Sequence, residues 1–136
     1  MNLIGQIINA MIAYYAGDVR RINHFLKVYG FAKAIGEMEG LDESTQEIIE
    51  IAALTHDIGI KNSEKKYNSS AGNYQQIEGP PEAKKLLEGL GIESSVIDRV
   101  CWLIAHHHTY TDIQGIDYQI LVEADFLVNF YEDDMS

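Results

Sequence analysis

The stretch IAALTHDIGI, from Ile51 to Ile60, places a histidine and an aspartate side by side within a run of apolar residues. Burying the imidazole of His56 and the carboxylate of Asp57 without partners would cost several kcal/mol, so other residues must satisfy both. The chain offers three candidates far away in sequence: His24, the triplet His106–His108, and Asp125 within a second apolar run, LVEADFLVNF. Because imidazole and carboxylate groups bind divalent transition metals, these residues could together hold one metal ion.

Apolar residues recur at intervals of three and four along nearly the whole chain, which indicates helices. We expect an all-α fold, a single-domain bundle over residues 1–136 with about six or seven helices. Asp18 is expected to cap the second helix, and Ser44 with Glu47 to form a capping box for the third, which is apolar on almost every side and should be central. The expected helices cover about residues 3–15, 18–35, 44–57, 80–90, 93–107 and 117–131, with Pro80 and Pro81 in the first turn of the fourth and a surface loop at 61–78.

Composition limits the partners and the compartment. The net charge of −11, from 21 acidic and 10 basic residues, argues against a nucleic-acid partner, because such binding depends on lysine and arginine. A single cysteine, Cys101, excludes an internal disulfide framework and fits a reducing compartment. No signal peptide is recognisable, and no apolar run approaches the ~20 residues that span a bilayer. We therefore expect a cytoplasmic protein without membrane association; the sequence does not constrain its oligomeric state.

Four short elements follow one another in a recognisable order: RINH (Arg21–His24), AALTHDIG (Ala52–Gly59), WLIAHHH (Trp102–His108) and EAD (Glu123–Asp125). In these elements the chain resembles the HD-domain superfamily, over about residues 18–131. Members of this superfamily are helical and largely metal-dependent phosphohydrolases. The resemblance implies that one divalent ion is coordinated by four residues: His24, His56, Asp57 and Asp125.

The ligand set limits which metal ions can bind and which reaction they can support. Two imidazoles and two carboxylates suit Mn, Fe, Co, Ni or Zn better than an all-oxygen Mg site, although Mg remains a candidate. Such an ion can activate a water for attack on phosphorus. We predict hydrolysis of a small phosphorylated metabolite or nucleotide, with Asp57 also orienting the water, and leave open whether the bond is a monoester, a diester or a pyrophosphate. The alternative is a catalytically silent domain that binds metal or nucleotide and regulates.

The histidine triplet cannot face one site as a whole, because adjacent helical residues lie about 100° apart. Continuing the apolar face favours His107 or His108, and the paired histidines of the family match either His106–His107 or His107–His108. We favour His106 and His107 as catalytic residues. As an imidazolium, one of them could bind a phosphate or protonate the leaving group.

Two cations are expected to bind the substrate. Arg21 lies one turn before His24, and its guanidinium matches phosphate oxygens, whereas Arg20 is expected to face solvent. Lys61 follows the His–Asp motif directly and could attract a phosphate. Ile60 and Lys61 also stand where (p)ppGpp hydrolases and deoxynucleoside monophosphate phosphatases of the superfamily carry an acidic residue, which argues against both activities. Glu78 occupies roughly the place of a second-metal histidine, but we expect a loop carboxylate there and a single metal.

Overall fold

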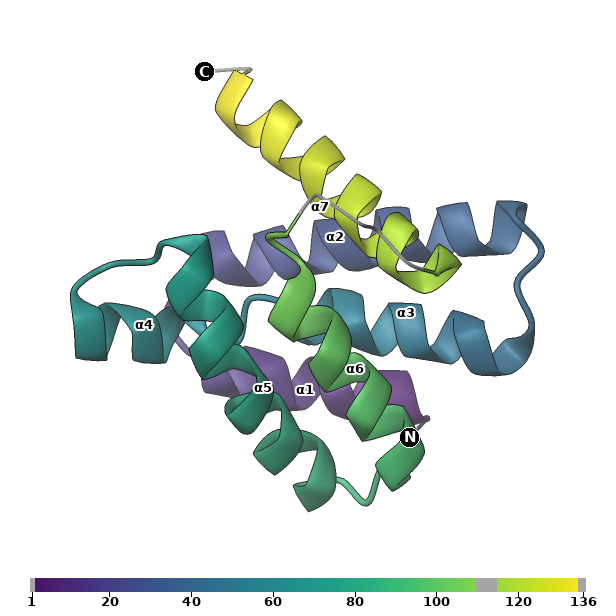
Figure 1. Cartoon of the computed structure of the whole chain (residues 1–136), viewed down its shortest axis with the longest axis horizontal. Helices are drawn as coiled ribbons and strands as arrows, with labels where there is room; N and C mark the ends of the chain where they lie inside the picture. Colours follow the sequence, from purple (N-terminus) through teal and green to yellow (C-terminus); the bar gives the residue numbers. More distant parts are fainter. Residues whose placement is uncertain (1, 110–114, 135–136) are drawn as a thin grey trace.

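The computed structural model describes residues 2–109 and 115–134, and the regular structure in this part of the chain is entirely helical (Figure 1). The all-α prediction is therefore confirmed. No helix among the described residues has the length and apolar character needed to cross a membrane. The described part contains seven helices: α1 (Leu3–Tyr14), α2 (Val19–Met38), α3 (Glu43–Thr55), α4 (Ile60–Tyr67), α5 (Gly72–Gly89), α6 (Ser94–His106) and α7 (Ile116–Asp134).

Short polar side chains begin the first three helices. Asn2, Asp18 and Asp42 each accept a hydrogen bond from the backbone N–H three residues later, at 2.7, 3.2 and 2.7 Å respectively. These bonds satisfy donors that have no partner within the helix. The predicted cap at Asp18 is confirmed. The predicted capping box of Ser44 and Glu47 is wrong, because α3 begins earlier, with Asp42 as its cap.

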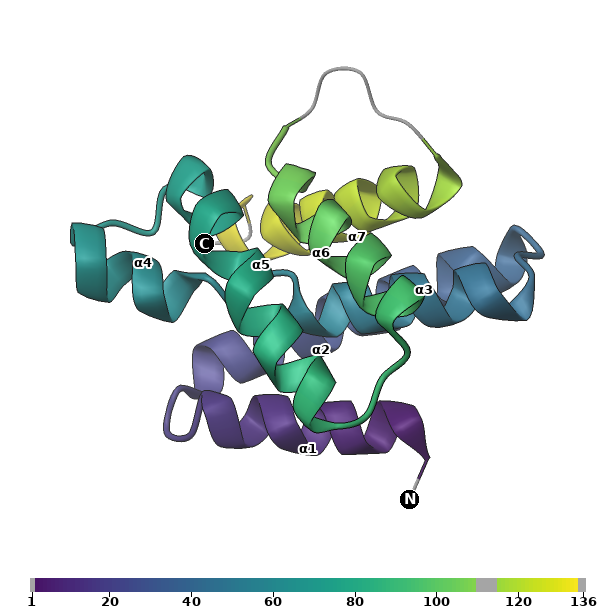
Figure 2. The same ribbon diagram turned by 60° about the horizontal axis from the view of Figure 1, so that its bottom comes forward.

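Helix α3 is central, as its apolar sequence predicted. It contacts α1, α2, α6 and α7, and every residue from Ile49 to Thr55 is buried. Figure 1 shows α2 running beside α3, and Figure 2 shows α1 and α7 on opposite sides of it. The C-terminal end of α3, which leads into His56 and Asp57, therefore lies inside the molecule.

Much of residues 61–78 is helical, and the predicted surface loop there is wrong. Helix α4 occupies the first part, and α5 already begins at Gly72. Within α4 only Ile60 and Ser63 are buried, so a narrow inner face anchors a helix whose sequence is otherwise polar. Asn68 then ends α4 in the left-handed conformation, with a φ of 54°.

The prediction that Pro80 and Pro81 lie in the first turn of a helix is also wrong, because both lie inside α5. Each lacks an N–H group, so the carbonyls four residues earlier lose their helical hydrogen bonds. The turns before the prolines nevertheless bury Gln75, Glu78 and Gly79, and α5 packs on both α4 and α6. This tertiary packing extends the helix upstream of the prolines.

The turn between α3 and α4 touches the backbone of α5 at Gly59. A Cβ atom placed on Gly59 would lie 2.6 Å from the nitrogen of Gly79 and 2.8 Å from the carbonyl oxygen of Gln75. Both are backbone atoms, so a side chain would have to push the turn away from α5. Glycine at this position therefore lets the turn that carries His56 and Asp57 lie directly on α5.

We expect Gly59→Ala to lower the free energy of unfolding by about 2 kcal/mol or more, because the methyl group overpacks a backbone contact. Gly30→Ala is the control: Gly30 lies within α2, a methyl group added to it would meet nothing within 4 Å, and the change should stabilise by about 0.5–1 kcal/mol. Urea unfolding in the presence of a chelator measures both. Equal stability of Gly59→Ala and wild type would contradict the close contact.

Candidate metal centre

The His56–Asp57 pair lies in the tight turn that follows α3. The backbone N–H of Ile58 donates to the carbonyl of Thr55 at 3.0 Å. Tyr15, the residue that caps the C-terminus of α1, donates its hydroxyl to the carbonyl of Asp57 at 2.5 Å. Burial, together with the charge of Asp57, raises the pKa of this hydroxyl, so it remains a donor. The turn is thereby fixed from within and from the neighbouring helix.

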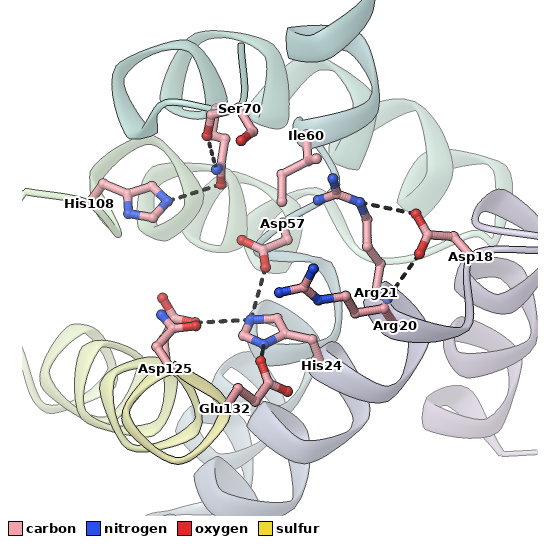
Figure 3. A pocket seen from close by; sticks show the side chains of 12 residues that line it. Asp18, Arg20, Arg21, His24, Asp57, Ile60, Ser70, His108, Asp125 and Glu132 are labelled. Carbon is pink, nitrogen blue, oxygen red and sulfur yellow. Dashed lines mark hydrogen bonds and ion pairs between the residues drawn. The ribbon is translucent and has the colours of Figure 1, made fainter. Parts of the chain in front are cut away.

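Side chains from three parts of the chain converge beside this turn. The group comprises His24 from α2, His56 and Asp57 from the turn, and Asp125 from α7, and its ligand atoms all lie within 4.8 Å of one another. We call these residues the His–Asp cluster. The Nε2 atom of His24 lies 3.0 Å from Asp57 Oδ2 and 3.2 Å from Asp125 Oδ1, and Figure 3 shows the ring between the two carboxylates. The Nε2 atom of His56 lies 3.2 Å from the same two oxygens. The structure thus brings together all four residues predicted as metal ligands.

The electrostatics of the cluster favour a bound positive charge. Burial lowers the pKa of His24, but hydrogen bonds with Asp125 and Asp57 outweigh burial and raise it to about 9. Burial raises the pKa of Asp125, yet the positive charge of His56 and the hydrogen bonds with both imidazoles hold it well below its usual range. Protons on the imidazoles therefore balance two ionised carboxylates in a largely buried site. A divalent cation bound to the same four donors would balance them equally, so the donor set fits such an ion.

Each imidazole of the cluster is oriented through its other nitrogen. His56 Nδ1 lies 2.7 Å from the carbonyl oxygen of Ala53, and His24 Nδ1 lies 3.0 Å from Glu132 Oε1. A neutral ring that donates from Nδ1 presents the lone pair of Nε2, which is the atom that faces the carboxylates. Lys27 holds the second oxygen of Glu132 at 3.1 Å. Glu132 therefore orients His24, although the sequence did not single it out.

His107 also faces the cluster, from the C-terminal end of α6. Its Nε2 lies 3.6 Å from Asp57 Oδ1, while Nδ1 hydrogen-bonds the carbonyl of Ile104 at 2.6 Å. Nε2 is buried and has no hydrogen-bond partner among the residues that the structure describes. An unsatisfied buried nitrogen is costly, and it marks a position where a ligand or substrate atom can bind.

The other two histidines of the triplet point in different directions. His106 stacks on Trp102, with ring centroids 4.1 Å apart, and does not line the pocket. His108 does line it, and its Nε2 lies 3.0 Å from Gln75 Oε1. The pair that faces the cluster is therefore His107–His108 and not His106–His107. Continuation of the apolar face of α6 indicates the same two residues, because His107 and His108 follow the buried Ile104 by three and four positions. With Asp57, this pair forms a second group of ligand atoms within 4.8 Å.

Both cations predicted to bind substrate have partners elsewhere. Arg21 lines the pocket, but its guanidinium hydrogen-bonds Asp18 at 3.1 Å and Glu64 at 3.1 Å. Lys61 donates to the carbonyl of Tyr14 at 3.2 Å and lies over its ring, 4.9 Å from the centroid. The contacts of these two side chains therefore give little support to a role in substrate binding.

Glu78 does not belong to the cluster. It is a buried residue of α5, whereas we expected a loop carboxylate. Lys66 and Tyr67 donate to its two oxygens at 2.9 and 3.0 Å. Both carboxylate oxygens of Glu78 therefore accept hydrogen bonds that link the C-terminal end of α4 to α5.

The cluster borders a pocket of about 540 Å³, shown in Figure 3. Asn129 and Glu132 could have been anticipated, because they follow Asp125 by one and two helical turns and therefore share its face. The other additional lining residues depend on how the helices pack, and neither spacing nor composition indicates them. The lining residues that the sequence did not assign to the site are Asp18, Arg20, Ile60, Ser70, Gln75, His108, Asn129 and Glu132.

Comparison with known proteins gives one match. The sequence model of the HD domain matches residues 21–132, which is most of the chain and includes the whole His–Asp cluster. This match confirms the resemblance seen in the four sequence elements. Searches of curated proteins and of solved structures gave no significant match.

We expect Glu132→Gln to weaken divalent-metal binding by about 10- to 100-fold, because His24 loses the carboxylate that orients it. Glu123→Gln, an exposed position on the same helix, removes the same charge and should leave affinity unchanged. Competition with a fluorescent chelator measures both. Equal losses in the two variants would indicate an effect of net charge and not of ring orientation.

The stability of the protein in chelator should fall as pH rises from about 6.5 to 9. The pKa of His24 is raised in the folded state to about 9, so its contribution is complete below its ordinary pKa and is lost as pH passes the folded value. The loss should be about 2–3 kcal/mol. Saturating metal should weaken or reverse the trend, because the ion displaces the proton. Urea unfolding at several pH values measures the free energy of unfolding, with His24→Gln as control. If stability falls as steeply with pH in this variant as in wild type, His24 is not the group responsible.

Proposed function

The chain belongs to the HD domain family, and on that premise we propose that it is a metal-dependent phosphohydrolase acting on a small phosphorylated metabolite or nucleotide. The observation that carries the proposal is the His–Asp cluster beside a polar pocket. Its donors fit a divalent cation, and the pocket is large enough for a small organic phosphate next to that cation.

In this proposal the four residues of the cluster hold one divalent ion. The bound ion would polarise a phosphoryl group and make a water more acidic. The backbone of the turn, held by Tyr15, keeps Asp57 in place. Glu132 and the carbonyl of Ala53 keep the two imidazoles in the orientation that binds metal.

Asp57 and His107 are proposed to handle the water and the protons. Asp57 Oδ2 faces the two imidazoles, whereas Oδ1 faces His107 and can orient the attacking water. The water oxygen bonds to phosphorus and releases one proton to solvent, the bond from phosphorus to the leaving oxygen breaks, and that oxygen takes a proton. His107 Nε2, which has no hydrogen-bond partner among the described residues, is the nitrogen that we propose gives this proton.

Purified protein should contain about one divalent ion per chain and hydrolyse at least one member of a panel of phosphorylated compounds. The panel comprises p-nitrophenyl phosphate, bis(p-nitrophenyl) phosphate and common nucleotides, each with Mn²⁺, Co²⁺, Ni²⁺ or Mg²⁺. Asp57→Asn should lose both metal and turnover, because it removes a ligand charge that both imidazoles of the cluster contact. Metal content by mass spectrometry and phosphate release measure the two effects. Stoichiometric metal without turnover would instead favour a regulatory binding domain, and a second ion would point to Asp57, His107 and His108.

The same assay separates two neighbouring histidines. His107→Gln should retain the metal but lose about 100-fold or more in kcat, because it removes the proton donor. His106→Gln should stay near wild type, since that ring stacks on Trp102 outside the pocket. A larger loss of kcat in His106→Gln than in His107→Gln would instead assign the proton donor to His106.

A further inference from the structure

Two adjacent arginines at the start of α2 line the pocket, but only one is free to bind an anion. Arg21 is held by Asp18 and Glu64, each at 3.1 Å. Arg20 is exposed and forms no hydrogen bond or ion pair with residues 2–109 or 115–134. Figure 3 shows its side chain extending toward His24 and Asp57, whereas the guanidinium of Arg21 turns toward Asp18. Arg20 is exposed, as expected, but it also lines the pocket and has no partner among the described residues.

The remaining wall of the pocket offers little further positive charge. Ser70, Gln75 and Asn129 add only uncharged hydrogen-bonding groups. Glu132 adds a carboxylate, which Lys27 holds from outside the pocket at 3.1 Å. A ligand with one phosphate could place it between the cluster and Arg20. A polyphosphate would extend its further charges along a wall without other free cations, where carboxylates would repel them.

We propose that Arg20 anchors the phosphate of a monoester whose organic part is uncharged and carries hydroxyl or amide groups. This inference rests on the proposed phosphohydrolase function and names its substrate class. The guanidinium is planar and binds phosphate oxygens through two parallel N–H groups. The pocket, at about 540 Å³, has the size of sites that hold small organic ligands, so it has room for a polar organic group beyond the phosphate.

Binding of inorganic phosphate to the metal-loaded protein tests the anchor without requiring turnover. Isothermal titration should show that Arg20→Gln weakens phosphate binding roughly tenfold or more, with metal content unchanged. Arg20→Lys should fall between it and wild type, because it keeps the charge but loses the paired N–H groups. Lys65→Gln is the matched control, since Lys65 is an exposed residue outside the pocket that carries the same charge.

Two results of this titration would overturn the anchor. One is phosphate affinity in Arg20→Gln equal to that of wild type. The other is an equal loss in Lys65→Gln, which would mean that net charge and not a contact governs binding. Because Arg20 has no partner among the described residues, its substitution should not unfold the protein; thermal unfolding checks this.

Turnover then tests the substrate class. With ribose 5-phosphate and a nucleoside monophosphate compared against ATP and tripolyphosphate, wild type should favour the monoesters in kcat/KM. Arg20→Gln should raise KM for the monoesters more than it lowers kcat. Preference for polyphosphates would overturn the substrate class. Phosphate binding that depends on Arg20 without turnover of any compound would refute the hydrolase and leave the anchor standing.

Discussion

Attraction between two carboxylates and two imidazoles, which are fully or largely buried, is the interaction around which this bundle is arranged. None of these groups could be buried alone without a large penalty. The Nε2 atom of each imidazole lies 3.0–3.2 Å from an oxygen of each carboxylate. Helices α2 and α7 and the turn after α3 must therefore meet at one point. That requirement places the end of α3 inside the molecule and explains why this helix is apolar on nearly all sides.

The cluster and the helical class could be predicted because both correspond to patterns of neighbouring residues in the sequence. An ionisable residue within an apolar run shows where burial and charge coincide, and both His56 and Asp125 stand out in this way. Helix periodicity is equally local. Local patterns do not reveal α4, because only Ile60 and Ser63 of this helix are buried. They also mislead at Pro80, where packing against neighbouring helices overrides the preference of proline for a first turn.

The roles of the flanking cations and histidines could not be predicted, because they depend on partners that are distant in sequence. Arg20 and Arg21 are chemically identical, and the difference between them is set by Asp18 together with Glu64 on α4. A helix at residues 60–67 was not expected, so the second partner was not foreseeable. Likewise, His108 lines the pocket beside Gln75 of α5, a partner 33 residues away in sequence.

The order of the cluster along the chain bears on how the protein is made. A ribosome releases α2 and α3 well before α7, so a growing chain carries His24, His56 and Asp57 long before it carries Asp125. Until α7 docks, the two imidazoles have only the carboxylate of Asp57 beside them. On the function proposed here, a chain that has not yet folded through α7 therefore lacks a complete metal site.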